Sequence, residues 1–338
     1  MTTSQPRVSV IIKAFNEEAK ITLAIESALA AVAAVDGGGE VILADSLSTD
    51  GTVEAARAYP VRIVQLLDGQ DRSCGVGAQL GMVAARGEFL YILDGDMELT
   101  ADFLPQALER FDAEPGLAGV AGQVQEMRVV NQVFLRRQQS GETTTPGRDL
   151  VCLNMGGLYR RAAVAELGYL TNRNLHAFEE FELGVRLVDA GWQLERIAVT
   201  AVRHYGHTDS TYALLWRRWR SRHAWGHGEL LRQAWKRSHL PLAVRHLRLY
   251  RVAGFVAGSW LGLAALAWAG GIALPWAASV AAGYWGVVFA TLAVRKRSLS
   301  SAAYSLVAWH FTLAGLVRGL VAAPRTAAEA PVAHRILQ

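Results

Sequence analysis

The chain has 338 residues, a formal net charge of +4, 51% hydrophobic residues and a mean hydropathy of +0.18. Its two cysteines, Cys74 and Cys152, exclude a small disulfide-stabilised fold and a cysteine-rich metal site. The charge is divided: residues 1–210 hold 18 Lys and Arg against 28 Asp and Glu (18 − 28 = −10), and residues 211–338 hold 16 against 2 (+14). This predicts an acidic front part and a basic back part with different roles.

Strands and helices are expected to alternate through the first 100 residues. Continuous apolar runs rich in β-branched residues predict buried strands at Val8–Ile12, Glu40–Ala44, Val61–Leu66 and Phe89–Leu93. Helical periodicity lies between them, so we expect a Rossmann-like, mostly parallel α/β sheet flanked by helices. Ligands bind such sheets at the carboxyl ends of the strands, where the sequence places Asn16, Asp45 and Asp94.

Two carboxylates, Asp94 and Asp96, follow the fourth expected strand and are separated only by Gly95. If the chain bends at this glycine, both side chains can reach one divalent cation, Mg²⁺ or Mn²⁺, beside substrate phosphate oxygens. A polar turn after a strand is the alternative for an isolated pair.

The pair is accompanied by other motifs in a fixed order: VSVIIKAFNEE, LADSLSTDGT, GEFLYILDGDMEL and FEEFELGVRLVDAGW. Together they resemble the inverting nucleotide-sugar glycosyltransferases of family 2, which have a GT-A fold. The resemblance covers residues 8–210. It implies that Asp94 and Asp96 both bind the metal, with Asp96 as the principal ligand and Asp94 also facing the nucleotide and sugar. It further implies that the nucleotide is contacted by Phe15, Asn16, Glu17 and Asp45.

Acidic residues gather in the last of these motifs. The resemblance implies that Glu180 is the general base that takes the proton of an acceptor hydroxyl, with Glu179 as its rival and Glu182 on the acceptor side. The residues alone allow simpler explanations. Glu179 and Glu180 fall at a helix N-terminus, where carboxylates are favoured, and Glu182 is spaced for an i,i+4 pair with Arg186.

Further candidates are less specific. His204 or His207 is expected to complete the metal shell, although a structural histidine is the alternative. The glycines Gly156 and Gly157 in NMGGLYRR match the acceptor-side loop of the family and allow close backbone approach. Arg72 is placed to reach a phosphate, or is a solvated loop arginine.

The back part predicts membrane attachment. Val252–Ala269 and Trp276–Val294 are uncharged runs that approach the roughly 20 residues of a bilayer-spanning helix, and buried core helices are the alternative. A third run, Ala302–Ala323, contains Arg318 and either spans the bilayer or lies in its interface.

A basic, tryptophan-rich segment precedes these runs. Residues 216–251 hold ten Lys and Arg, four Trp and one acid, which suits amphipathic helices in a headgroup layer. Nucleic acid is not an expected partner, because uncharged spans follow at once. The organisation predicted is a GT-A domain at 1–210, interfacial helices at 211–251, two or three transmembrane helices at 252–323 and a tail at 324–338.

We therefore expect a membrane-bound hexosyl-type glycosyltransferase of a bacterial inner membrane. The N-terminus lacks a signal-peptide run and basic clusters flank the spans, so the catalytic domain is expected in the cytoplasm. The donor is a nucleoside-diphosphate sugar and the acceptor a polyprenyl-linked or other glycan. Membrane lipids are partners, and the spans allow self-association.

Two other functions remain open. A processive polysaccharide synthase would carry Gln-x-x-Arg-Trp near residue 219, but Leu215 replaces the glutamine before Arg218 and Trp219. A sugar nucleotidyltransferase would need a Gly-rich phosphate loop after the first strand, where this chain has KAFNEE.

Overall fold

The computed structural model describes residues 5–129, 131–206 and 208–338. The chain forms two compact units, and each is described by itself. The first, which we call the sheet unit, comprises the chain up to Thr208 together with Pro324–Gln338. The second, the helical unit, comprises Asp209–Ala323.

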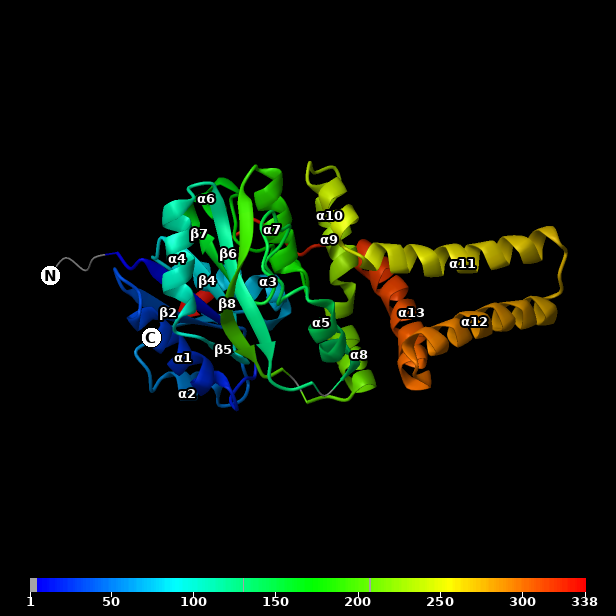
Figure 1. Cartoon of the computed structure of the whole chain (residues 1–338), viewed down its shortest axis with the longest axis horizontal. Coiled ribbons are helices and arrows are strands. Elements are labelled where there is room, and N and C mark those ends of the chain that lie inside the picture. Colours follow the sequence, from blue (N-terminus) through cyan, green and yellow to red (C-terminus); the bar gives the residue numbers. More distant parts are fainter. Residues whose placement is uncertain (1–4, 130, 207) are drawn as a thin grey trace. The chain divides into compact units, whose positions relative to one another are not determined.

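A mixed sheet forms the centre of the sheet unit (Figure 1). In the described residues its strand order is β5-β8-β6-β7-β4-β1-β2-β3-β9. The four strands expected from the sequence pair in parallel, in the order β4-β1-β2-β3, whereas β7 pairs antiparallel with both β4 and β6. The bounds are β1 (Val8–Ala14), β2 (Gly39–Asp45), β3 (Arg62–Leu66), β4 (Phe89–Asp94), β5 (Met97–Leu99), β6 (Leu117–Glu126), β7 (Gly157–Arg160), β8 (Gln193–His204) and β9 (His334–Ile336).

Helices cover both faces of this sheet. Along β1 the side chains alternate, so that Val10 and Ile12 pack toward α1 and α4, and Ile11 packs toward α3 and α7. Burial on both faces explains why the strands read as continuous apolar runs. The helices of this unit are α1 (Ile21–Ala33), α2 (Thr52–Ala56), η1 (Gly69–Asp71), α3 (Cys74–Ala84), α4 (Phe103–Ala113), α5 (Gln132–Ser140), α6 (Arg161–Glu166) and α7 (Glu179–Asp189).

The register of the parallel strands brings their carboxyl ends to one edge. Ala14 of β1 pairs with Asp45 of β2, and Lys13 of β1 pairs with Asp94 of β4. The turns that follow β1, β2 and β4 therefore leave the sheet side by side. This edge carries most of the polar residues that the sequence singled out.

Three long apolar helices dominate the helical unit. α11, α12 and α13 are each long and apolar enough to cross a membrane by length and composition. Short helices rich in Arg and Trp precede them. The bounds are α8 (Thr211–Arg220), η2 (His223–Trp225), α9 (Gly226–Ala234), α10 (Leu240–His246), α11 (Leu249–Ala269), α12 (Leu274–Lys296) and α13 (Leu299–Val321).

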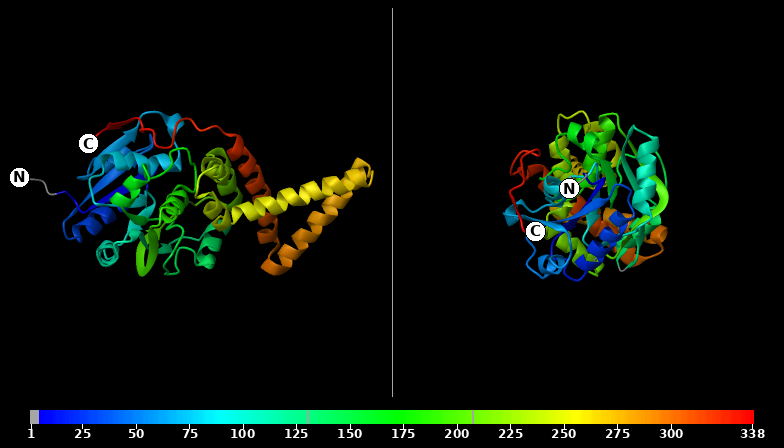
Figure 2. Two further views of the ribbon diagram at one scale, coloured as in Figure 1. Left: turned by 90° about the horizontal axis from the view of Figure 1, so that it is seen from above. Right: turned by 90° about the vertical axis from the view of Figure 1, so that its left-hand side faces the viewer.

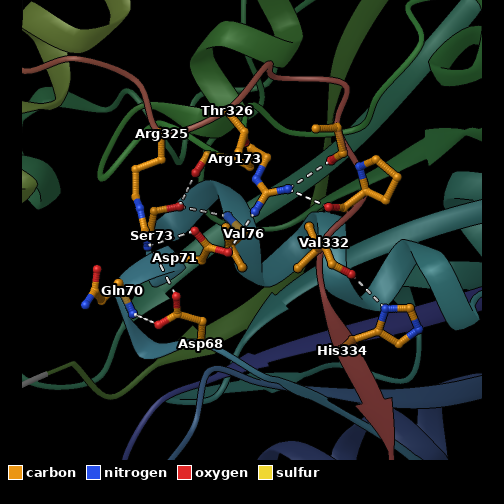
Figure 3. Close-up of polar contacts among 12 residues, drawn as sticks. Asp68, Gln70, Asp71, Ser73, Val76, Arg173, Arg325, Thr326, Val332 and His334 are labelled. Carbon is orange, nitrogen blue, oxygen red and sulfur yellow. Dashed lines mark hydrogen bonds and ion pairs between the residues drawn. The ribbon is translucent and has the colours of Figure 1, made fainter.

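The segment after α13 returns to the sheet unit, where the sequence predicted only a tail. Its strand β9 pairs antiparallel with β3, and Figure 2 shows this red segment beside the blue and cyan part of the sheet. The preceding residues are held by Arg173, which donates to the carbonyls of Ala330 and Pro331 and pairs with Asp71 at 3.0 Å (Figure 3). Arg325 binds the other oxygen of Asp71 at 3.0 Å.

Replacing Arg173 by methionine is expected to lower the free energy of unfolding of the sheet unit by about 3 kcal/mol, because a buried pair and two bonds to the segment after α13 are lost. Urea titration followed by intrinsic fluorescence measures this loss. Arg325→Met is the matched control. Its side chain is 43% exposed, so it should cost less than about 1 kcal/mol. Equal losses in the two variants would show that Arg173 does not hold the segment.

Candidate active site

The turns after β1 and β2 are hydrogen-bonded to each other. Asn16 Oδ1 accepts from the backbone N–H of Thr49 at 2.8 Å, and the N–H of Asn16 donates to Ser48 Oγ at 2.9 Å. The N–H of Glu17 donates to Thr52 Oγ1 at 2.8 Å. Asn16 has a φ of 56°, a left-handed conformation that asparagine tolerates better than most residues. Asn16 and Glu17 therefore shape the rim at which the sequence placed the nucleotide.

Asp45 is fully buried at the end of β2. Its Oδ2 accepts from Gln65 Nε2 at 2.7 Å and from the N–H of Ser48 at 3.1 Å. Gln65 in turn accepts from Arg335 Nε at 2.8 Å, which ties strand β9 to this carboxylate. The aspartate thus fixes the turn after β2, in which Leu47 adopts a φ of 61°.

Arg72 and Phe15 form a stacked pair at the same edge. The guanidinium carbon lies 3.7 Å from the centre of the Phe15 ring, and Nε donates to the carbonyl of Ser46 at 2.8 Å. Burial lowers the pKa of Arg72, and the charge of Asp45 opposes that shift. Arg72 is therefore a fixed, partly buried residue and not the solvated loop arginine that the sequence also allowed.

Lys13 gathers the acids of two distant motifs. Its Nζ lies 2.9 Å from Asp94 Oδ1, 2.9 Å from Glu179 Oε1 and 4.0 Å from Glu180 Oε1. Although burial alone lowers it, these carboxylates raise the pKa of Lys13 well above its ordinary value. Our sequence reasoning missed this residue. The available signal was a lone charge inside the apolar strand VSVIIKA.

Glu180 has the environment of a base. Burial, followed by the charges of Glu179 and Asp94, raises its pKa to about 8, while Lys13 and the N–H of Gly156 act in the opposite direction. One carboxylate oxygen, Oε2, is buried and has no hydrogen-bond partner among the residues that the structure describes. A buried acceptor of this kind is costly unless a ligand donates to it.

Glu182 is engaged elsewhere. Its Oε1 lies 2.8 Å from Arg186 Nε and accepts from the hydroxyl of Tyr169 at 2.9 Å. The i,i+4 pair that the spacing predicted is confirmed. The Oε2 atom of Glu182, like that of Glu180, is buried with no hydrogen-bond partner in the described residues, so the ion pair with Arg186 is what sets Glu182 apart.

The loop before β7 has an unusual backbone. Asn154, Met155 and Gly156 have consecutive positive φ values of 50°, 58° and 98°. A Cβ added to Gly156 would lie 2.7 Å from the Tyr91 hydroxyl oxygen, and one added to Gly157 would lie 2.8 Å from a Leu153 methyl carbon. The backbone conformation of Gly156 therefore requires glycine, Gly157 leaves little room for a side chain, and the turn brings the Gly156 N–H to Glu180.

Asp96 lies beside His204, because β5 pairs antiparallel with β8 and sets Met97 opposite His204. Asp96 Oδ2 is 3.4 Å from His204 Nε2, while His204 Nδ1 is 2.7 Å from Glu126 Oε2. Burial alone would favour the neutral ring, but the bonds to Asp96 and Glu126 raise the pKa of His204 to about 9. His207, the other candidate, lies outside the described residues.

This arrangement fits a divalent cation. A carboxylate and an imidazole nitrogen converge, and the carboxylate of Glu126 orients the ring as second-shell partners of metal-bound histidines do. No group of three or more His, Cys, Asp or Glu side chains is gathered as a metal site in the described parts of the chain. The carboxylate of Asp96 is the type of ligand that Mn²⁺ or Mg²⁺ accepts with substrate oxygens, whereas the imidazole of His204 is a more usual ligand of transition metals than of Mg²⁺.

Comparison with known proteins bears on this edge of the sheet. Residues 9–168 match the family described as "Glycosyl transferase family 2". This match spans just under half of the chain and supports its assignment to glycosyltransferase family 2. The matched residues include the turns after β1, β2 and β4 and the loop before β7, whereas Glu179, Glu180 and His204 lie beyond them.

Two curated relatives are similar to this chain over 113 residues. The succinoglycan biosynthesis protein ExoO of Rhizobium meliloti is 36% identical over 32% of this chain and 30% of its own length. The dodecaprenyl-phosphate galacturonate synthase of Rhizobium johnstonii is 31% identical over 31% of this chain and 32% of its own length. The chain thus spans about a third of the length of these relatives.

A solved structure shows the fold of this chain over most of its length. The mannosyltransferase PcManGT of Pyrobaculum calidifontis, solved with GDP-Man and Mn²⁺, superposes with a TM-score of 0.59 at 21% identity and covers 94% of this chain and 88% of its own. The expected GT-A fold, followed by apolar helices, is therefore confirmed.

Proposed function

We propose that this chain is a membrane-bound inverting glycosyltransferase of family 2 with Glu180 as its general base. The main support is the cluster in which Lys13 lies within 4.0 Å of Asp94, Glu179 and Glu180. One buried oxygen of Glu180 has no hydrogen-bond partner in the described residues. An acceptor hydroxyl that donates a hydrogen bond to this oxygen would satisfy it, and its proton would be positioned for transfer to Glu180.

The reaction follows as a single displacement. The acceptor oxygen forms a bond to the anomeric carbon while the bond from that carbon to the diphosphate oxygen breaks. Glu180 receives the hydroxyl proton, and the electron pair of the broken bond leaves with the diphosphate. Lys13 holds Glu179 and Asp94 in place and limits the rise in the Glu180 pKa.

The donor is proposed to lie along the ends of β1, β2 and β4. The Arg72–Phe15 stack offers a flat surface to a nucleotide base, and the rim built by Asn16, Glu17 and Asp45 frames the nucleoside. Asp94 faces the sugar. Asp96 and His204 would hold a Mg²⁺ or Mn²⁺ ion that neutralises the leaving diphosphate.

The acceptor is proposed to be a polyprenyl-linked glycan at the cytoplasmic face of a bacterial inner membrane. Three helices have the length and composition of membrane spans, and the basic segment before them suits anionic lipids. Two curated relatives are named for succinoglycan biosynthesis and for dodecaprenyl-phosphate galacturonate synthesis. Processive synthesis of a polymer is the second candidate, favoured only by Arg218 and Trp219.

The test uses the full chain purified in detergent. Nucleoside-diphosphate sugars are first screened with Mn²⁺ by thermal shift, because a ligand that binds the folded state raises Tm. The stabilising donor is then offered with polyprenyl-phosphate-linked and soluble sugars. One sugar added to the lipid-linked acceptor is the expected result. Transfer to soluble sugars alone would contradict the lipid acceptor, and long products would favour the processive alternative.

The proposed base predicts a pH dependence. Only deprotonated Glu180 can accept a proton, so kcat/KM should rise with pH and reach half its maximum near pH 8. Below that midpoint each unit of pH should lower the rate about tenfold. Steady-state nucleotide release between pH 6 and 9.5 measures the profile. A flat profile over this range, as a carboxyl group with the ordinary pKa of glutamate would give, would contradict the buried environment of Glu180.

A further inference from the structure

Strand β9 limits how the chain can cross a membrane. It is hydrogen-bonded to β3 in the sheet unit, and Arg173 and Arg325 fasten the residues between α13 and β9 to Asp71 (Figure 3). The residues up to Thr208 and the residues from Pro324 on therefore belong to one folded body, the sheet unit. A folded body lies on one side of a bilayer, so the segment between these points must cross an even number of times.

The number of candidate helices is odd, and this creates a conflict. α11, α12 and α13 each have the length and hydropathy of a span. Three crossings would put β9 on the opposite side from β3, to which it is paired. At least one of the three helices must therefore remain on the surface.

The connecting segments indicate which two helices cross. The bend between α11 and α12, Gly270–Ala273, carries no charge, whereas α12 ends in Arg295 and Lys296 and is followed by Arg297. Basic residues in short loops favour the cytoplasmic side of the membrane, whereas an uncharged bend is readily translocated across it. If two of the three helices cross, only α11 and α12 can carry the uncharged bend across the bilayer and leave the basic residues on the same side as the sheet unit.

The packing of α13 agrees with this choice. A Cβ added to Gly315 would lie 2.0 Å from the Ala224 carbonyl oxygen, and one added to Gly319 would lie 2.2 Å from that of Trp225, so α13 packs backbone to backbone on η2 and α9. His227 Nε2 lies 2.8 Å from the Thr312 carbonyl oxygen, and Arg232 donates to the carbonyl of Gly319 at 3.2 Å.

These contacts make a spanning α13 costly. α9 carries His227, Glu229 and Arg232, so moving the second half of α13 into hydrocarbon would carry these polar side chains with it. Ionisable groups in a bilayer core are expensive unless they line a polar path. α13 is better placed at the interface, where Arg318, which lies over the ring of Trp225, can reach headgroups.

The α11–α12 hairpin has the opposite character. None of the apolar window of α12 is buried within the structure, and Trp268, Leu274 and Trp276 are 88%, 83% and 71% exposed. With 21 and 23 residues, the two helices are about 30–35 Å long and match a hydrocarbon core. Figures 1 and 2 show α13 running across the open end of this hairpin and not alongside it.

We propose that the chain enters the bilayer as a two-helix hairpin of α11 and α12, while α13 lies at the membrane surface with η2 and α9. The bend at Gly270–Ala273 then faces the side opposite the sheet unit, and the segment after α13 lies on the same side as the sheet unit. The proposal rests on the membrane attachment in the proposed function but not on its chemistry.

Single-cysteine variants of the full chain test this topology. Cys74 and Cys152 are replaced by serine, and one cysteine is introduced at an exposed position: Asp36→Cys in the sheet unit, Ala273→Cys in the bend, Ser300→Cys at the start of α13 or Glu329→Cys after it. Each variant is labelled with a membrane-impermeant maleimide in sealed spheroplasts and in inverted vesicles. Labelling after detergent lysis and a thermal unfolding scan verify that each variant is folded and reactive.

The expected result is that Asp36→Cys, Ser300→Cys and Glu329→Cys label in one preparation and Ala273→Cys in the other. Labelling of Glu329→Cys together with Ala273→Cys would show that α13 crosses and would overturn the proposal. Labelling of Ala273→Cys together with Asp36→Cys would overturn it as well, because the hairpin would not cross. The assay needs no turnover, so its outcome is separate from that of the glycosyltransfer assay.

Discussion

Replacing Glu180 by glutamine is expected to lower kcat by about 10²–10⁴-fold, the usual contribution of a positioned general base. Glutamine keeps the size of the side chain but cannot take the acceptor proton. Donor affinity should change less than about threefold, because Glu180 is proposed to face the acceptor and not the nucleotide. Steady-state nucleotide release measures kcat, and calorimetric titration with the donor measures Kd.

Glu179→Gln is the matched control, since its carboxylate lies in the same cluster and its Oε1 contacts Lys13 at 2.9 Å. This variant should keep kcat within about tenfold of the parent. It should also move the midpoint of the pH profile to lower pH, because the negative charge of Glu179 helps to raise the pKa of Glu180. The two variants thus differ in rate and in pH dependence.

A reversed pattern would change the assignment. If Glu179→Gln lost turnover and Glu180→Gln kept it, Glu179 would be the base and Glu180 its neighbour. Full activity in both variants would remove the acid cluster from the mechanism altogether.

Local sequence patterns located the sheet edge because each signal is contained in a few adjacent residues. The run VSVII predicts β1, and FLYIL followed by Asp94-Gly95-Asp96 predicts β4 and its polar end. Parallel pairing of neighbouring βα units then puts these ends together. The structure confirms this arrangement through the register of Lys13 with Asp94.

Contacts between distant segments could not be predicted in the same way. Lys13 and Glu179 are 166 positions apart, and only the packing of α7 against the sheet brings them to 2.9 Å. The support of His204 by Glu126 depends on parallel pairing of β6 with β8, which no local pattern encodes. Strand β9 is three residues long and follows an Ala-rich stretch, so its pairing with β3 gave no periodic signal.

The distinction between Glu182 and Glu180 shows what spacing alone can decide. A helical spacing of four residues predicted the pair of Glu182 with Arg186, and the structure confirms it. No spacing rule predicts that burial and the charges of Glu179 and Asp94 raise the pKa of Glu180, because that depends on which side chains surround it. Burial and charge, and not sequence position, separate a structural carboxylate from a reactive one.

Replacing Asp96 by asparagine is expected to weaken Mn²⁺-dependent donor binding by about 3 kcal/mol, or roughly a hundredfold in Kd. The neutral amide keeps the shape of the side chain but is a much weaker ligand than a carboxylate. Donor affinity measured in EDTA should be the same in the variant and the parent, because the nucleoside rim of Asn16, Asp45 and Arg72 is unchanged. Calorimetric titration of the donor with and without Mn²⁺ separates the two contributions.

Glu126→Gln provides a graded control. Glutamine can still bond to His204 Nδ1, which now lies 2.7 Å from the carboxylate, but it no longer polarises the ring. Loss of such a second-shell charge should lower Mn²⁺ affinity about 10–100-fold, and the effect on donor binding should vanish at saturating Mn²⁺. If Asp96→Asn bound the donor as tightly as the parent with Mn²⁺, the cation would be held elsewhere, and Asp96 and His204 would serve only to join β5 to β8.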